Sequence, residues 1–187
     1  MDQHRIIIIA AIVIAVLVLA ALAWLLFRKR RSRQLRERFG PEYDRVVRSE
    51  GDVRRGEGVL EWRAKRRENI NIRSLSPSAR SDFANRWTNI QSQFVDDPKG
   101  TVSRADGLVN EVMQARGYPM GNFEQRAADI SVDHPIVVEN YRAAHDIALR
   151  HSRGQASTED LRKAMVYYRS LFDELLSDTS VAQRKEA

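Results

Sequence analysis

An uninterrupted apolar run, Ile6–Phe27, dominates the hydropathy pattern near the N-terminus. It contains 22 residues and no charge, and an α-helix of that length rises about 33 Å, against about 30 Å for the hydrocarbon core of a bilayer. Because a helix satisfies its own backbone groups, the run predicts a transmembrane helix. A cleaved signal peptide is the alternative, with a small-residue site at Ala21-Leu22-Ala23. It is less favoured, since the run continues past that site.

Further along the chain, apolar residues recur at spacings of three and four, the pattern of amphipathic helices. Three helices are predicted from such stripes. Their inward faces are Ala79, Phe83, Trp87, Ile90 and Phe94, then Val102, Ala105, Leu108, Val109, Val112 and Met113, and finally Leu161, Met165, Tyr168, Phe172 and Leu175. Two more helices are predicted between the second and third of these. The first covers Phe123–Ile130, and the second follows Pro135 with Ile136, Val137, Tyr141, Ala144 and Ala148 inward.

Residues 42–67, which follow the apolar run, are charged on every side. Gly40-Pro41 predicts a helix end before them, because proline removes a backbone donor and disfavours helix in the residue before it. Glycines at positions 51, 56 and 58 would each weaken a helix by about 1 kcal/mol. A broken, solvent-rich helical stalk and a partly disordered linker both fit this segment. The alternation over 69–73 predicts an extended connector, since no second strand is available to pair with it.

These patterns predict an all-α protein with one transmembrane helix, a basic juxtamembrane stalk and a compact cytosolic bundle of four to five helices. The predicted segments are a short extracytoplasmic N-terminus (1–5), the transmembrane helix (6–27), the basic helical stalk or linker (28–67), a soluble α-helical domain (68–177) and a polar tail (178–187).

The net charge of +6 is concentrated after the apolar run. Residues 28–67 hold fifteen basic and seven acidic side chains, whereas residues 68–187 hold fifteen basic and seventeen acidic ones. Since positive flanks stay in the cytosol, we expect a bacterial inner-membrane protein with its N-terminus outside and its C-terminal domain in the cytosol. The nearly neutral domain argues against nucleic-acid binding. Anionic lipid headgroups are possible ligands of Arg28, Lys29, Arg30, Arg31 and Arg33.

Catalytic motifs are missing from the sequence. It has no glycine-rich phosphate loop, no His-Glu-x-x-His and no Gly-x-Ser-x-Gly, and the lack of cysteine excludes thiol chemistry. No cofactor or metal site is predicted. Trp87, Phe94, Phe83 and Tyr118 could line an aromatic pocket, but their helical spacing favours a place in the core.

One segment, 124–134, could still carry chemistry, because it combines Glu124, Asp129 and Asp133 with His134. Acids mixed with arginines more often form ion pairs on a helix face. Asp133, just before His134-Pro135, instead predicts a helix N-cap, with Pro135 in the first turn of the helix that carries Tyr141. His134 is then structural, and its loss should cost little stability if its ring faces solvent.

Three runs of residues resemble a family of uncharacterised bacterial single-pass membrane proteins. They are Phe39-Gly40-Pro41-Glu42-Tyr43-Asp44-Arg45, Phe94-Val95-Asp96-Asp97-Pro98, and the stretch from Phe123 to Pro135. The resemblance implies a bacterial cytoplasmic membrane setting, and it implies no activity, ligand or catalytic residue.

The function that follows is a membrane-anchored, non-enzymatic interaction or scaffold module with a protein partner. Tethering would support this role by raising the effective concentration of the bundle near its partners. The alternative is a small membrane-tethered, hydrolase-like enzyme that uses the acids and histidine of segment 124–134.

Overall fold

The computed structural model describes the backbone of residues 2–177 and the side chains of residues 13–177. Over these residues the chain forms eight α-helices and no β-strand, so the predicted all-α class is confirmed. The helices are α1 (Asp2–Phe39), α2 (Pro41–Glu50), α3 (Val53–Glu68), α4 (Pro77–Ser92), α5 (Pro98–Arg116), α6 (Phe123–Asp133), α7 (Val138–Ser152) and α8 (Thr158–Leu176). The predicted polar tail, 178–187, lies outside the described residues.

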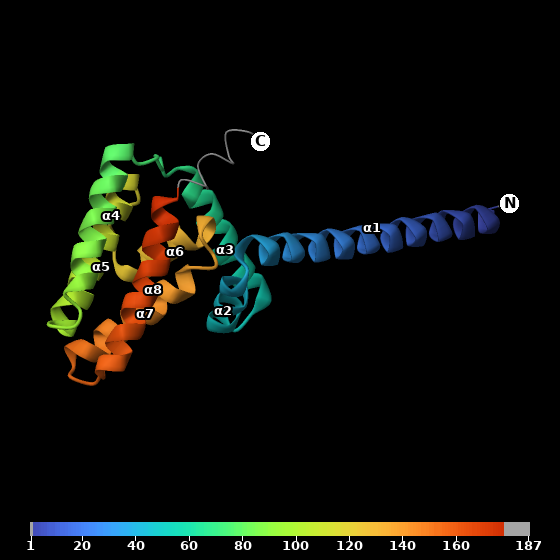
Figure 1. Cartoon of the computed structure of the whole chain (residues 1–187). Coiled ribbons are helices and arrows are strands. Elements are labelled where there is room, and N and C mark those ends of the chain that lie inside the picture. The colour runs from blue at the N-terminus through green and yellow to red at the C-terminus, as the bar shows by residue number, and fades with distance from the viewer. Residues whose placement is uncertain (1, 178–187) are drawn as a thin grey trace.

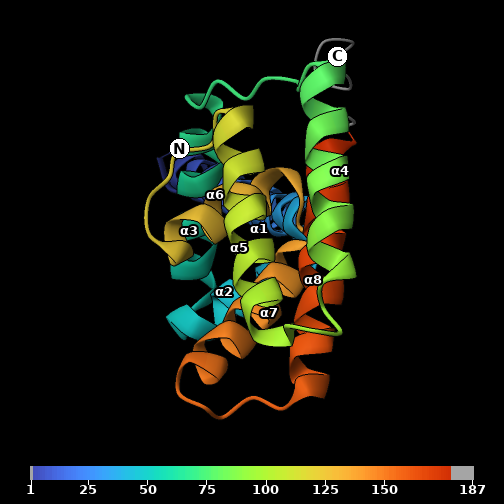
Figure 2. The same cartoon turned by 60° about the vertical axis from the view of Figure 1, so that its left-hand side comes forward.

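The molecule consists of a helical body and one projecting helix (Figure 1). Helices α4 to α8 form the larger part of the body, and α2 and α3 lie between this part and the base of α1. Helix α1 extends away from the body as a straight arm, and α4 lies beside α5 and α8 on the opposite side of the body (Figures 1 and 2).

The larger core lies among α4 to α8, and the predicted apolar stripes form it. All six inward residues of the α5 stripe and all five of the α8 stripe are buried, and Trp87 of α4 stacks on Phe172 of α8 with ring centroids 4.7 Å apart. Ile136 is an exception, because it is 78% exposed. It lies in the turn before α7, so it does not share that helix's buried face.

A second, smaller core joins the base of α1 to α2, α3 and α6. It comprises Leu35, Phe39, Tyr43, Val46, Leu60, Ala64 and Val132. Residues 42–67 therefore belong to packed helices and do not form a linker. Gly56 allows the close approach of α3 to α2, since a Cβ atom there would lie 2.9 Å from the Cα atom of Val47.

Several helices begin or end at residues whose side chains or backbone favour a cap. The hydroxyl of Ser76 accepts a hydrogen bond from the backbone of Ala79, and Ser157 with Asp160 forms a reciprocal capping box at the start of α8. Gly117 ends α5 with a φ of 92°, a conformation that glycine adopts without steric cost. These caps fix the bounds of the bundle helices.

The predicted transmembrane helix is contradicted by the structure. Among the described residues, no helix has both the length and the apolar character needed to cross a membrane. The described apolar part of α1, Val13–Phe27, has fifteen residues and rises only about 22 Å before the basic residues begin at Arg28. The rest of the predicted span, 6–12, and the N-terminus, 1–5, lie outside the described side chains. The predicted single-pass topology and inner-membrane localisation depended on this helix, so both are contradicted as well.

Candidate functional site

The acids of segment 124–134 face arginines of α3. Arg66 and Arg67 are adjacent in the last turn of α3, and both contact the second half of α6. The Nε atom of Arg66 donates to the carboxylate of Asp129 at 3.1 Å, and the Nε atom of Arg67 donates to the carboxylate of Asp133. Both carboxylates are almost fully buried. This pairing holds α3 against α6.

Asp133 does not cap a helix, so the prediction for this residue is wrong. It is the last residue of α6, and α7 begins only at Val138, without a side-chain cap. Besides Arg67, the Asp133 carboxylate accepts a hydrogen bond from the Tyr118 hydroxyl at 3.3 Å. Burial raises the pKa of Tyr118, and the negative charge of Asp133 raises it further. Tyr118 is therefore a neutral hydrogen-bond donor.

His134 is also not solvent-facing, since it is only 4% exposed. Its Nδ1 atom lies 3.0 Å from the carboxylate of Glu174 on α8. Burial lowers the pKa of His134 by more than the hydrogen bond to Glu174 raises it. Next to this contact, the buried Arg116 donates to the carbonyl oxygen of Leu175 at 2.7 Å. Both contacts fix the C-terminal end of α8 to the rest of the bundle.

Glu42 connects three helices from a fully buried position in the first turn of α2. Its Oε1 atom accepts hydrogen bonds from Arg63 of α3 at 2.8 Å and from Arg142 of α7 at 3.0 Å. Arg142 also donates to Glu124, at 2.7 Å. Arg63 further contacts the hydroxyl of Ser131 on α6 at 3.5 Å. Sequence reasoning missed this arrangement, because one glutamate among many charged residues of 42–67 has no distinguishing pattern.

The candidate catalytic residues therefore do not come together. Glu124, Asp129, Asp133 and His134 each face a different partner on another helix. Within the described residues there is also no group of three or more His, Asp or Glu side chains that could hold a metal ion. The arrangement joins helices and lacks the converging acid and base that hydrolysis requires.

A second polar cluster, absent from the sequence predictions, lies between α5, α6, α7 and α8. Asn110 donates to Asp106 at 3.2 Å, Tyr141 donates to Asn110 at 3.4 Å, and Arg126 donates to the Tyr141 hydroxyl at 3.2 Å. Burial raises the pKa of Tyr168, and the neighbouring Asp106 raises it further. These bonds join three helices, as in a structural network inside a core, but Asp106 Oδ1 and the Tyr168 hydroxyl are buried without a hydrogen-bond partner among the described residues.

The predicted lipid-binding residues lie on α1, where the arm meets the body. Arg31 forms a two-pronged ion pair with Glu61 of α3, and Arg33 pairs with Glu37 at 2.8 Å. The guanidinium of Arg28 lies 5.6 Å from the ring centroid of Trp24. The remaining two candidates, Lys29 and Arg30, are exposed. Nothing in the structure tests the binding of lipid headgroups, so this binding stays a prediction.

A groove of about 340 Å³ lies between the end of α4 and α8. Its apolar lining comprises Trp87, Phe94, Val95, Met165 and Val166. Two arginines of α8, Arg162 and Arg169, complete the wall. The aromatic stripe of α4 thus has two roles, because Trp87 packs in the core and one edge of it reaches the groove. The sequence analysis favoured the core for these aromatic residues over a shared pocket. Trp87 and Phe94 do line the groove, whereas Phe83 and Tyr118 are buried and do not line it.

No family model, curated protein or solved structure matches this chain. The resemblance to single-pass membrane proteins stays an expectation. Any functional conclusion must therefore come from the geometry of the chain itself.

Proposed function

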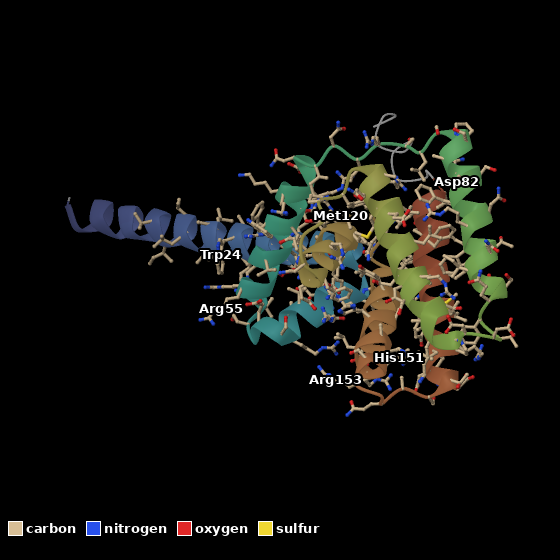
Figure 3. All side chains as sticks on the ribbon, turned by 90° about the vertical axis from the view of Figure 1, so that its left-hand side faces the viewer. Trp24, Arg55, Asp82, Met120, His151 and Arg153 are labelled. Atoms are coloured by element: carbon tan, nitrogen blue, oxygen red, sulfur yellow. The ribbon has the colours of Figure 1, made fainter. Side chains whose placement is uncertain are left out.

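We propose that this protein is a non-enzymatic interaction module that holds two binding surfaces at opposite ends. The observation that carries this proposal is the apolar arm. Large apolar side chains between Val13 and Phe27 are each at least half exposed, and exposed apolar surface of this extent marks an interaction site. In Figure 3, Trp24 lies on the arm outside the body, and Asp82 of α4 lies on the far side of the body.

The base of the arm is fixed, which supports a role in positioning. Leu35 and Phe39 of α1 are buried in the smaller core. Ser32 donates to Glu57 of α3, and Glu57 also accepts a hydrogen bond from Tyr43 at 2.9 Å. Because α1 is one continuous helix from Asp2 to Phe39, these contacts set the direction in which the arm leaves the body.

The polar residues of α6 support a non-enzymatic role. The acids of segment 124–134 connect helices through the ion pairs described above. We expect the arm to bind another apolar helix of a partner. The removal of two apolar surfaces from water stabilises such a contact.

A comparison of chain lengths tests the proposal. We expect the full chain to associate in aqueous buffer, as measured by light scattering, and a chain beginning at Arg28 to be a monomer with the same helical body. Leu19→Glu with Leu25→Glu should weaken association in the full chain, because both side chains are more than half exposed on the arm. Leu149→Glu, at an exposed position of α7, is the control for an added charge outside the arm. A monomeric full chain, in the same oligomeric state as the shortened chain, would refute the proposal.

A further inference from the structure

We propose that the groove between α4 and α8 binds an acidic, amphipathic helix of a partner protein. This inference rests on the proposed function and names the partner chemistry of the surface opposite the arm. It follows from the shape of the groove, the exposure of its apolar side chains and the sign of its charges.

The aromatic wall of the groove is held in place. Trp87 is only 1% exposed and stacks on Phe172, and its indole N–H donates to the side-chain oxygen of Gln91 at 3.1 Å. The guanidinium of Arg169 covers the same indole at 5.6 Å from the ring centroid. A preformed wall loses little conformational entropy on binding.

Apolar side chains extend from this wall into solvent. Val95 is 87% exposed and Val166 is 54% exposed, and both line the groove. Val95 is held by a hydrogen-bonded turn, because the backbone N–H groups of Phe94 and Asp97 donate to carbonyl oxygens of Gln91 and Gln93. A partner that covered these side chains would bury apolar surface, which is the main favourable contribution to association.

The charges that line the groove are both positive. Arg162 pairs with Glu159 one turn away on the same helix, and Arg169 pairs with Asp173 in the same way. These pairs are about half exposed, and such pairs contribute only about 0.2–1 kcal/mol each. A carboxylate of a partner can therefore replace Glu159 or Asp173 as the ion-pair partner of an arginine with little loss of free energy. No acidic residue lines the groove, so a basic partner would lack this compensation.

An amphipathic helix fits these features. In helix-in-groove recognition, apolar residues three and four positions apart enter the groove, and the flanking residues contact its rim. Apolar residues on the inward face would contact Trp87, Met165 and Val166, and acidic residues beside them would meet Arg162 and Arg169. A second copy of this chain could also occupy the groove. The experiment below distinguishes a second copy from a partner helix.

The experiment uses the full chain with Trp24→Phe and Trp62→Phe. Both replaced tryptophans are about half exposed, and the remaining Trp87 then reports on the groove alone. The probe is a synthetic helical peptide with leucines three and four apart and glutamates on both flanks. We expect saturable changes in Trp87 fluorescence with this peptide. A peptide of the same pattern with lysines in place of the glutamates should bind at least about tenfold more weakly, a difference of about 1.4 kcal/mol.

Two variants localise the binding. Val166→Glu places a negative charge at an exposed position of the groove and should weaken binding of the acidic peptide by at least about tenfold. Leu149→Glu makes the same kind of change at an exposed position of α7 outside the groove, and it should leave binding unchanged. Both substitutions lie on the surface, so the body should stay folded.

Three results would overturn the proposal. They are no Trp87 response to the acidic peptide, equal binding of the two peptides, and a concentration-dependent Trp87 signal without peptide that Val166→Glu removes. The last result would assign the groove to a second copy. Association through the arm does not involve Val166, so failure at the groove and failure of the proposed function can be told apart.

Discussion

The bundle and its junction with α2 and α3 are held together by different interactions. The bundle of α4 to α8 is joined by apolar side chains in amphipathic stripes. At the junction between α2–α3 and the bundle, Val132 of α6 packs in the smaller apolar core. The other contacts of the junction described above are between arginines and carboxylates. The first kind of contact is nondirectional and strong in sum, whereas the second needs each partner in place.

This difference predicts how each region responds to substitution. Loss of apolar volume in the bundle should cost stability in proportion to the cavity left behind. Loss of one charge at the junction should leave its partner buried without compensation, which is costly even though the pair itself adds little net stability. Exposed ion pairs elsewhere on the surface should matter far less.

The largest effect is expected in the bundle core. Phe172→Ala removes a ring that is 1% exposed and stacked on Trp87. The free energy of unfolding should fall by about 3–5 kcal/mol, the usual range for a buried phenylalanine. Denaturant melts of the chain beginning at Arg28 would measure it, with Val166→Ala on the same helix as an exposed control expected to stay within about 0.5 kcal/mol. A loss below about 1 kcal/mol for Phe172→Ala would contradict the picture of a close-packed core.

The junction is tested by Glu42→Gln. This change keeps the shape of the side chain but removes the negative charge between Arg63 and Arg142, which are themselves mostly buried. The free energy of unfolding should fall by about 3 kcal/mol, as expected when one partner of a buried ion pair is lost. Asp146→Asn, which breaks an exposed pair with Arg150, is the control and should cost less than about 1 kcal/mol. Similar losses for the two variants would show that the junction behaves as ordinary surface.

The sequence was informative for the bundle and uninformative for the junction, for a physical reason. A stripe such as that of α8 repeats with the period of the helix, so its burial can be deduced from a short window. The contact between Arg66 and Asp129 joins residues 63 positions apart, and nothing distinguishes Arg66 from the fourteen other basic residues of 28–67. The acids of segment 124–134 were correctly recognised as possible ion-pair partners, but their arginines on α3 were not.

Predictions from local sequence patterns were also wrong where a contact with a distant residue determined the position of a side chain. Asp133 precedes a proline-containing turn, which favours a cap, yet Arg67 and Tyr118 bind its carboxylate. The predicted membrane helix was wrong because it depended on apolar length, and the described part of α1 does not meet that criterion. The sequence offered an aromatic pocket with Trp87 and Phe94 only as the less favoured alternative, and it could not give the other wall of the groove, since that requires the end of α4 to lie beside α8.

The smallest effect concerns the contact between His134 and Glu174, which resembles the junction in its chemistry but lies in the bundle. An unfolded histidine titrates near pH 6.5. Burial holds the pKa of His134 below that value in the folded chain, although Glu174 and Asp133 oppose the shift and Arg116 adds to it. Below about pH 6.5 the unfolded chain therefore takes up a proton that the folded chain does not. The free energy of unfolding should fall by at most about 1.4 kcal/mol per pH unit until the folded pKa is reached.

His134→Asn should reduce this loss between about pH 7 and pH 5.5, because an asparagine amide can replace the Nδ1 contact to Glu174 without titrating there. Melts of the chain beginning at Arg28 at the two pH values would measure the difference. His145, whose pKa burial also lowers, is present in both proteins, so the difference between them reports His134 alone. If His134→Asn and the parent lose equal stability over this range, folding does not shift the pKa of His134, which would contradict this account. A smaller loss in the parent than in the variant would mean that His134 and Glu174 form an ion pair like those of the junction.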